Sequence, residues 1–355
     1  MKILRTILFL INLLLAIGLL LTTLAPVVAP SRSVLPSLLA FGYLPLLAAN
    51  VLMAVLWLVM GKWHFLLSAA AIAVRWGFVG LFFQVGGTAT VPDREEHPQM
   101  VSLMSYNVHL FKGLSNQAEQ SDNNATAFLA LVREYSPDIL CLQEFVSSNT
   151  INVTDSLALL GYNHYHGSHA DKKTPKSTVV FSRLPITYIK RIDNNKLLVE
   201  LMLDDQLFRL CCVHMDSYAL DDSNREEIEH LLHGEVDTKS RTLDKVKETI
   251  HMHETEWQDK MKSIVSESSL PMLLAGDFND IPSSWLYSQV SWLLDDTYRD
   301  KGFGISSTYN GDGFPHFRID YVFHSKEFKA LSYKRIKTDI SDHYPILTSF
   351  ELIQN

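Results

Sequence analysis

The first 92 residues of this 355-residue chain contain no aspartate or glutamate. They carry five basic side chains, so the other 26 basic and all 39 acidic residues lie in 93–355, whose net charge is −13. The chain therefore joins an apolar, cationic segment to an acidic one that is long enough to bury a large core. The acidic balance argues against tight nonspecific binding of nucleic acid, because such binding depends on neutralising phosphates.

Cysteine is also scarce, which excludes a small fold held together by disulfides. The three cysteines are Cys141, Cys211 and Cys212, and all lie in apolar, strand-like runs. Adjacent residues of a strand point to opposite faces, so Cys211 and Cys212 are poorly placed to bond to each other. We expect all three to act as small, buried hydrophobic side chains.

Charge is missing from long stretches of the first segment. There are 26 uncharged residues between Arg5 and Arg32, 29 between Arg32 and Lys62, and a third apolar stretch over 63–85. A spanning helix needs about 20 apolar residues. The first stretch could be a signal peptide, but it is long for one and a second stretch follows at once, which favours an uncleaved anchor.

We therefore expect a transmembrane region over 1–87 with about three helices, followed by a linker over 88–99 that contains Gly, Pro and charge. Arg75 lies within the third helix, where an arginine costs about 2.5–3.5 kcal/mol on insertion scales, and we expect it to snorkel or to face another helix.

The few charges of the first segment indicate an orientation. If all three helices span, Lys2, Arg5 and Lys62 lie in the cytoplasm, and Arg32 and Arg94 lie outside. The acidic segment would then be extracytoplasmic. If the third stretch is re-entrant, this assignment inverts.

The acidic segment alternates short, strand-like runs with helical patterns. Several runs are apolar on both faces, as expected for strands buried under helices. The pattern predicts helices over 125–135 and 240–268. No internal repeat or low-complexity tract interrupts it. Strands and helices mixed in this way predict a layered α/β sandwich in one domain over 100–355.

Polar side chains gather where the predicted strands end. Asp277 and Asn279 are two residues apart, so in extended backbone they face the same way. Hard oxygen ligands, histidines and amides at one edge of a sandwich suit Mg²⁺-assisted attack of water on a phosphate ester. The residues concerned are Asn107, Glu144, His214, Asp277, Asn279, Arg318, Asp320, Asp342 and His343.

Each of these features has a structural explanation when it is taken alone. A glutamate at a strand end commonly faces solvent, and the GDFND sequence around Asp277 could form an Asx turn. The pair Arg318 and Asp320 could be a surface ion pair, and the SDH sequence around Asp342 could be a helix cap. Their common order along the chain is what favours the functional interpretation.

Six motifs follow one another in the sequence: SYNV, LQEF, the strand VHM, GDFND, RIDYVF and SDHYPI. In this order they resemble the endonuclease/exonuclease/phosphatase superfamily, which includes pancreatic deoxyribonuclease, abasic-site endonucleases, neutral sphingomyelinases and inositol polyphosphate 5-phosphatases. The resemblance covers about residues 100–353 and is not specific to one substrate. It implies a four-layer α/β sandwich like that of deoxyribonuclease I. Residues 1–92 lie outside it and look like the multi-pass anchor of some bacterial members.

The resemblance implies a bound metal ion. Glu144 would be the principal Mg²⁺ ligand, assisted by Asn107 and Asp342. Mn²⁺ is a possible substitute, since the residue types alone do not distinguish the two ions.

The resemblance also implies catalytic roles. Asp277 would orient or deprotonate the attacking water, and Asn279 would hold a phosphate oxygen. His343, paired with Asp320, would stabilise the transition state or protonate the leaving oxygen. His214 matches the strand histidine of the deoxyribonuclease and sphingomyelinase branches.

Together these features predict a membrane-anchored, Mg²⁺-dependent phosphoesterase that cleaves a phosphodiester or phosphomonoester. Its substrate could be nucleic acid, a lipid headgroup or a small phosphoester, and the anchor and the acidic charge favour the last two slightly. The alternative is a catalytically silent membrane adaptor, which would be expected to have lost some of the positions above; none is lost. We expect a multi-pass protein of the bacterial inner (plasma) membrane.

Overall fold

The computed structural model describes residues 2–113, 120–147, 150–168, 177–218, 241–311 and 316–353. The chain forms two compact units. The helical unit comprises 1–81, 216–259 and 281–290, and the sheet unit comprises 82–215, 260–280 and 291–355. We describe each unit by itself.

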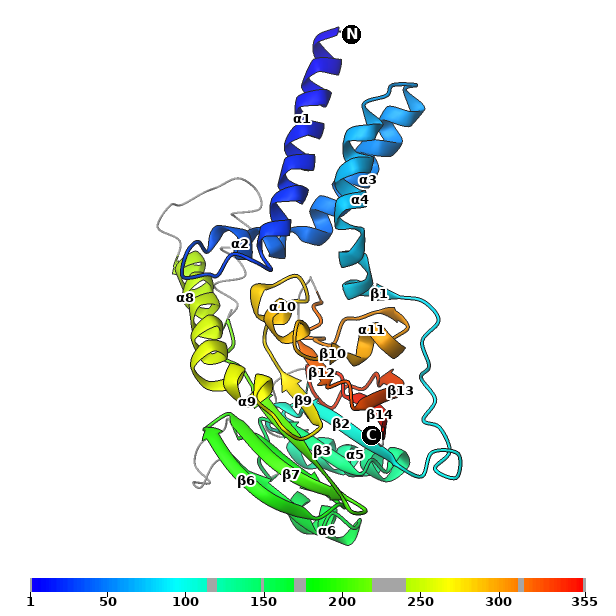
Figure 1. Cartoon of the computed structure of the whole chain (residues 1–355), viewed down its shortest axis with the longest axis vertical. Helices are drawn as coiled ribbons and strands as arrows, with labels where there is room; N and C mark the ends of the chain where they lie inside the picture. Colours follow the sequence, from blue (N-terminus) through cyan, green and yellow to red (C-terminus); the bar gives the residue numbers. More distant parts are fainter. Residues whose placement is uncertain are drawn as a thin grey trace. The chain divides into compact units, whose positions relative to one another are not determined.

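The helical unit contains the apolar segment of the sequence (Figure 1). Two of its helices, α1 and α4, are long and apolar enough to cross a membrane, and a third span is possible if α2 and α3, which meet at an angle of 64°, count as one bent helix. The helices are α1 (Lys2–Leu21), α2 (Leu35–Phe41), α3 (Tyr43–Val59), α4 (Phe65–Phe82), α8 (Arg241–Glu256) and α10 (Trp285–Ser291), the last residues of α4 and α10 belonging to the sheet unit.

Buried polar side chains join the apolar helices to one another. The Ser68 hydroxyl lies 2.5 Å from the Asn12 side-chain oxygen, between α4 and α1. Arg75, only 2% exposed, packs its guanidinium against the rings of Phe78, on the same helix, and Tyr43, on α3. Arg75 thus faces another helix, as its position in the sequence predicts.

The sheet unit is built on two six-stranded mixed sheets. Their strand orders are β13–β14–β2–β3–β5–β4 and β10–β12–β9–β8–β7–β6. The first sheet contains β2 (Met100–Asn107), β3 (Ile139–Gln143), β4 (His164–Gly167), β5 (Val179–Ser182), β13 (Phe328–Arg335) and β14 (Ile346–Leu352). The second contains β6 (Ile186–Asp193), β7 (Lys196–Leu203), β8 (Gln206–His214), β9 (Met272–Asp277), β10 (Asp295–Asp296) and β12 (Asp320–His324).

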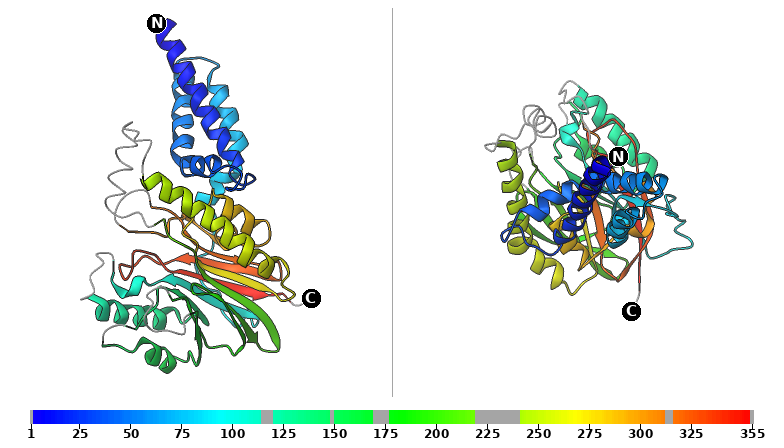
Figure 2. Two further views of the ribbon diagram at one scale, coloured as in Figure 1. Left: turned by 90° about the vertical axis from the view of Figure 1, so that its left-hand side faces the viewer. Right: turned by 90° about the horizontal axis from the view of Figure 1, so that it is seen from above.

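Alternation along the strands explains how these sheets stack. On β2, Leu103 contributes to the core between the two sheets, whereas Met104 contributes to a second core under α5 (Ser121–Tyr135) and α6 (Val153–Leu159). Figure 2 shows the sheets face to face with α5 and α6 on the outer side.

Helices also accompany the second sheet. The short helices α9 (Lys262–Ser266) and α11 (Thr297–Lys301) belong to the same unit, and α11 packs beside β12 and β13. Two mixed sheets flanked by helices confirm the predicted fold class. The predicted helices at 125–135 and 240–268 correspond to α5 and to α8, a π turn (Trp257–Met261) and α9.

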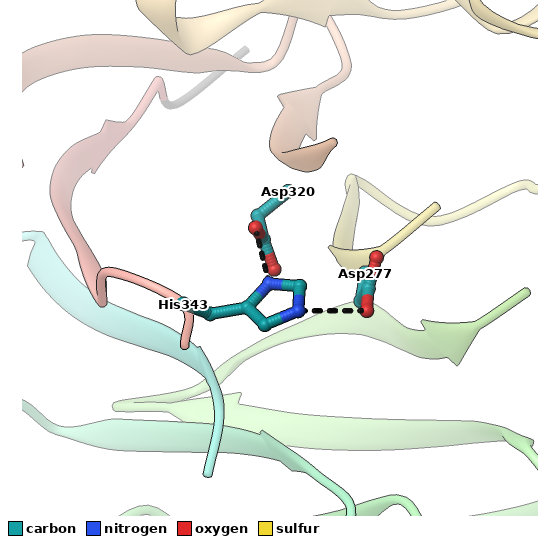
Figure 3. Close-up of side chains that lie close together, drawn as sticks. All are labelled: Asp277, Asp320 and His343. Atoms are coloured by element: carbon teal, nitrogen blue, oxygen red, sulfur yellow. Dashed lines mark hydrogen bonds and ion pairs between the residues drawn. The ribbon is translucent and has the colours of Figure 1, made fainter. Parts of the chain in front are cut away.

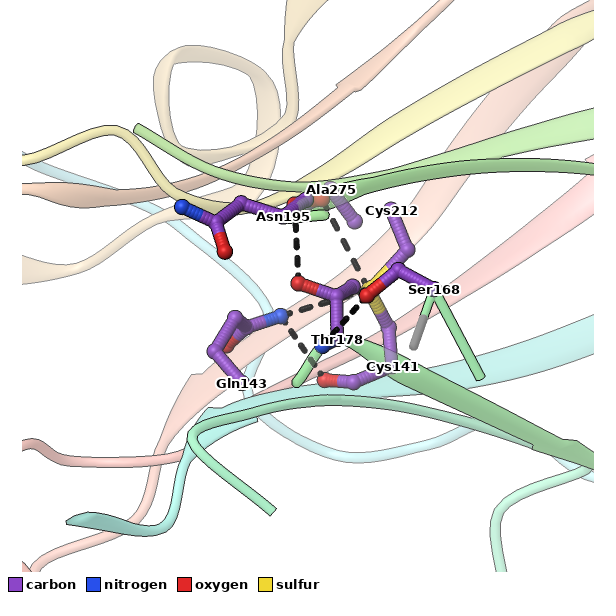
Figure 4. Close-up of a disulfide and its surroundings, with 7 residues drawn as sticks. All are labelled: Cys141, Gln143, Ser168, Thr178, Asn195, Cys212 and Ala275. Carbon is purple, nitrogen blue, oxygen red and sulfur yellow. Dashed lines mark hydrogen bonds between the residues drawn. A yellow bond between two sulfur atoms is a disulfide. The ribbon is translucent and has the colours of Figure 1, made fainter. Parts of the chain in front are cut away.

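The cysteines correct one expectation from the sequence. Cys141 and Cys212 form a disulfide, while Cys211 is a free, buried thiol (Figure 4). Cys141 on β3 and Cys212 on β8 point into the core between the sheets from opposite sides, so they meet despite a sequence separation of 71. Successive side chains of β8 point to opposite faces of the sheet, so Cys212 faces Cys141 while Cys211 points the other way.

Candidate functional site

Strand pairing in the sheet unit aligns the predicted site residues. His214, the last residue of β8, pairs with Asp277, the last residue of β9, and Asp277 also pairs with Asp320, the first residue of β12. In the first sheet, Asn107 at the end of β2 pairs with Gln143, immediately before Glu144. Both sheets therefore contribute polar side chains at their strand ends.

Asn107 links the two sheets. Its Nδ2 donates to Asp277 Oδ2 at 3.0 Å and, at 3.4 Å, to Glu144 Oε1. Glu144 has a φ of 51°, a left-handed conformation that is uncommon outside glycine, and its carbonyl accepts from the backbone N–H of Leu110 at 3.1 Å. A strained backbone thus holds the Glu144 carboxylate at the sheet edge, where 24% of the side chain is exposed.

A histidine lies between two carboxylates, as Figure 3 shows. Nδ1 of His343 is 2.9 Å from Asp320 Oδ2, and its Nε2 is 3.8 Å from Asp277 Oδ2. All three residues are buried. The Asp320 contact fixes the orientation of the ring and leaves Nε2 toward Asp277.

His214 approaches the same carboxylates from β8. Its Nε2 lies 3.7 Å from both Glu144 Oε1 and Asp277 Oδ2. Gly276 makes this register possible, because a Cβ at that position would lie 1.9 Å from the carbonyl oxygen of Val213. Close approach of β8 and β9 therefore requires glycine one residue before Asp277.

Burial and charge shift the acid–base properties of this cluster. Burial raises the pKa of Asp277 above its ordinary value, although the neighbouring His343 imidazole acts in the opposite direction. Burial alone would lower the pKa of His343, but the Asp320 and Asp277 carboxylates outweigh it and raise that pKa well above the usual value. The cluster consequently favours a proton on His343 near neutral pH.

Two predicted residues lie beside this cluster without contacting His343 through their side chains. The backbone N–H of Asn279 donates to Asp277 Oδ1 at 2.8 Å, and its side-chain Nδ2 donates to the carbonyl of Met215. Asp342 Oδ1 lies 3.2 Å from Nδ1 of His109.

Residues that the sequence did not indicate support the site. His109, with a φ of 44°, donates its backbone N–H to Asn107 Oδ1 at 3.0 Å. The Ser341 hydroxyl donates to the Asn107 carbonyl, and the Thr308 hydroxyl accepts from the Asp320 N–H at 3.1 Å. Ser341 belongs to the SDH motif and could have been noticed there, whereas no sequence pattern marks His109 or Thr308.

Among the residues that the structure describes, two groups could hold a metal ion. Ligand atoms of Asp277, Asp320 and His343 lie within 4.8 Å of one another. Glu144, with Asn107 beside it, offers a more exposed carboxylate. The oxygen donors at Glu144 and Asn107 suit a hard cation. The Asn107 amide oxygen accepts from the His109 N–H, so the amide would have to turn for this oxygen to reach the ion.

Comparison with known proteins gives the following matches. A model described as the Endonuclease/Exonuclease/phosphatase family matches residues 104–234 and 262–343, more than half of the chain. A second, described as a domain of unknown function (DUF8431), matches residues 5–82. No curated protein matches the sequence.

Several solved structures are similar to this chain at low sequence identity. The human Nocturnin catalytic domain is 17% identical, with a TM-score of 0.49 over 74% of this chain and 100% of that one. An endonuclease/exonuclease/phosphatase family protein from Bacteroides thetaiotaomicron is 18% identical, with a TM-score of 0.48 over 72% and 98% of the two chains. Truncated Caenorhabditis elegans TDP2 is 19% identical, with a TM-score of 0.47 over 72% and 99%.

The family match spans both the metal-binding and the acid–base candidates, from Asn107 to His343. It therefore includes every strand end that contributes a residue to the site. This chain belongs to the Endonuclease/Exonuclease/phosphatase family, and it is a hydrolase that acts on ester bonds.

Proposed function

We propose that this protein is a membrane-anchored, Mg²⁺-dependent phosphoesterase. The observation that carries the proposal is the contact network drawn from both sheets, in which the partly exposed Glu144 meets the buried side chains of Asn107, Asp277, Asp320 and His343. Buried charges are costly unless they are paired, so a cluster of this kind is kept where chemistry needs it.

Glu144, Asn107 and Asp342 would hold the metal ion. We favour them over the Asp277, Asp320 and His343 group because Nδ1 of His343 is already engaged by Asp320, and because Mg²⁺ prefers oxygen ligands. The ion would stabilise charge on the phosphate oxygens and polarise the phosphorus for attack. Mn²⁺ could replace it at the same ligands.

The remaining residues would handle protons and phosphate oxygens. Asp277, buried but held by the Asn107 amide, would orient the attacking water or take its proton. His343, kept protonated by Asp320, would donate from Nε2 to the phosphate or to the leaving oxygen. His214 would add a second donor near Glu144 and Asp277, and Asn279 would hold a phosphate oxygen after releasing Met215.

Residues 1–87 would form the transmembrane region, 88–99 the linker and 100–355 the catalytic domain. The apolar length of α1 and α4 supports the anchor. The Cys141–Cys212 disulfide supports an extracytoplasmic catalytic domain, because disulfides persist in oxidising compartments and are rare in the cytoplasm. A bacterial plasma membrane with this domain on its outer side is consistent with both features.

The substrate would be a phosphate ester from a lipid headgroup, a small molecule or a nucleic acid. The anchor and the net charge of −13 over 93–355 favour the first two, since a polymeric polyanion would meet an acidic domain.

The test uses the full-length protein in detergent or nanodiscs. Wild type and Glu144→Gln are assayed with Mg²⁺ on plasmid DNA, RNA, sphingomyelin, phosphatidylinositol phosphates and a chromogenic phosphodiester. Glu200→Gln is the matched control, because Glu200 is bonded to Arg209 on the paired strand, away from the strand ends of the site. We expect Glu144→Gln alone to abolish cleavage, EDTA to abolish it in wild type, and added Mg²⁺ to restore it.

Each outcome decides between alternatives. Cleavage of lipid alone would explain the anchor as access to substrate, whereas cleavage of DNA or RNA would make the protein an anchored nuclease. Hydrolysis that resists EDTA would contradict the metal-assisted mechanism. Silence on every substrate, with both variants folded, would favour an adaptor that uses the fold for binding.

A further inference from the structure

A small two-stranded sheet of the sheet unit carries an exposed apolar face. Strand β1 (Phe83–Gln84) pairs antiparallel with β11 (Gly304–Ile305), with Phe83 directly opposite Ile305. Val85 lies directly after β1 and Phe303 lies directly before β11, so two further apolar residues adjoin the pair. The exposed fractions of these four side chains are 48% for Phe83, 77% for Val85, 70% for Phe303 and 70% for Ile305.

The rest of the sheet unit holds this small sheet in place. The carbonyl of Gly304 accepts from the Tyr298 hydroxyl at 2.6 Å, and that of Ile305 accepts from Arg335 at 3.3 Å. The Thr88 N–H donates to the Lys301 carbonyl at 3.0 Å. Four large apolar side chains are therefore displayed on a fixed support.

The apolar face begins directly after α4, which indicates that lipid covers it. Phe82 is the last residue of α4, a helix apolar enough to span a membrane, and β1 begins at Phe83. Within the sheet unit, the Ser306 N–H donates to the Phe82 carbonyl at 3.1 Å, which holds β11 beside the residue that precedes β1. Where a spanning helix ends, its neighbours meet the boundary between acyl chains and headgroups.

We propose that the apolar face formed by Phe83, Val85, Phe303 and Ile305 docks into the outer boundary of the lipid bilayer. Apolar side chains buried at this depth add binding free energy in proportion to their area. The Arg335 guanidinium, bonded to the Ile305 carbonyl, adds a positive charge beside β11, which suits the negative charge of phospholipid headgroups. This proposal rests on the proposed membrane anchor.

Docking here would set the height of the active site above the membrane. The segment that follows β11 reaches the site directly, since Thr308 accepts from the Asp320 N–H and Tyr309 forms a β-bridge with His343. The three residue steps from Ser306 to Tyr309 span at most about 10 Å. The site would therefore act on phosphate esters presented at the membrane surface, such as phospholipid headgroups.

The experiment measures the depth of single labels in the full-length protein. The three native cysteines are buried, so a cysteine introduced at an exposed position is labelled selectively with bimane. The test positions are Ile305→Cys and Phe303→Cys, in phosphatidylethanolamine and phosphatidylglycerol vesicles that carry nitroxide lipids at the headgroup or along the acyl chain. Leu159→Cys on α6, 90% exposed, is the matched control away from β11, and Val74→Cys on α4 reports on the anchor itself.

We expect bimane at 303 and 305 to be quenched several-fold more than at 159, and most strongly by nitroxide near the headgroup. Quenching at 74 together with equal, weak quenching at 305 and 159 would overturn the docking proposal and leave the anchor intact. Absence of quenching at 74 would instead remove the anchor, and the docking proposal with it.

Discussion

Both units of this chain bury polar side chains, but the partners of those side chains differ. In the helical unit, Asn50 donates to the backbone carbonyl of Leu15 at 3.0 Å. In the sheet unit, Asp277, Asp320 and His343 are partners for one another. A backbone carbonyl does not titrate, whereas three ionisable groups in contact share protons and charge.

Buried polar side chains therefore have different roles in the two units. In the helical unit, uncharged polar side chains bond to backbone, as Asn50 does, or to one another, as Ser68 and Asn12 do, and so join apolar helices. Ionisable side chains that bond to one another keep a high-energy arrangement ready for a metal ion or a phosphate. Removing a member should therefore change activity in the sheet unit and only stability in the helical unit.

The strongest test of this comparison is Asp277→Asn. The change keeps the size of the side chain but removes the carboxylate that we assign to the attacking water, so we expect kcat on a chromogenic phosphodiester to fall by about 10²–10⁴-fold. The control is Asp244→Asn on α8, where the native carboxylate is 74% exposed. Unchanged kcat in a folded Asp277→Asn protein would remove Asp277 from the mechanism.

The disulfide gives the next largest effect. Replacing Cys141 and Cys212 together by alanine should lower the free energy of unfolding of the sheet unit by about 4 kcal/mol, as expected for a closed loop of 71 residues. Denaturant unfolding, with and without reductant, measures this loss. Reductant should destabilise wild type and Cys211→Ala alike but leave the double variant unchanged; equal sensitivity of all three would argue against the bond.

A pH dependence should distinguish His343 from an ordinary buried histidine. Its folded-state pKa is raised, so the stabilisation it provides is complete below its unfolded pKa of about 6.5 and is lost as pH rises through the folded value. We measure the difference in free energy of unfolding between wild type and His343→Gln in the presence of chelator. The difference should shrink with rising pH.

Asp320→Asn is the control for this titration. Without that carboxylate, the pKa of His343 should be lower, so the same loss of stability should occur at lower pH. A difference that does not vary with pH would mean that His343 is held neutral.

The smallest effect is expected in the helical unit. Asn12→Leu removes the contact with Ser68 and the donor to the His64 carbonyl, and should lower stability in bicelles by about 0.6–2 kcal/mol. Phosphodiester turnover should not change, because no ionisable group is lost. A large drop in turnover would show that the helical unit contributes to activity.

The sequence predicted the fold class because strand alternation and helix periodicity are local properties. It also pointed to strand ends as the source of site residues, and the structure brings Asn107, Glu144, Asp277, Asp320 and His343 into contact. The catalytic and metal-binding roles of these residues remain predictions.

Other features depend on contacts between distant segments. The Cys141–Cys212 bond needs two sheets stacked with their inner faces in register, and the support from His109 needs a left-handed turn that no residue preference indicates. The apolar face at β1 and β11 joins residues more than 200 positions apart. The sequence by itself determined which elements form and which side chains end them, because those follow from local periodicity. Only the tertiary structure decided which of those ends meet, because that follows from how the sheets pack.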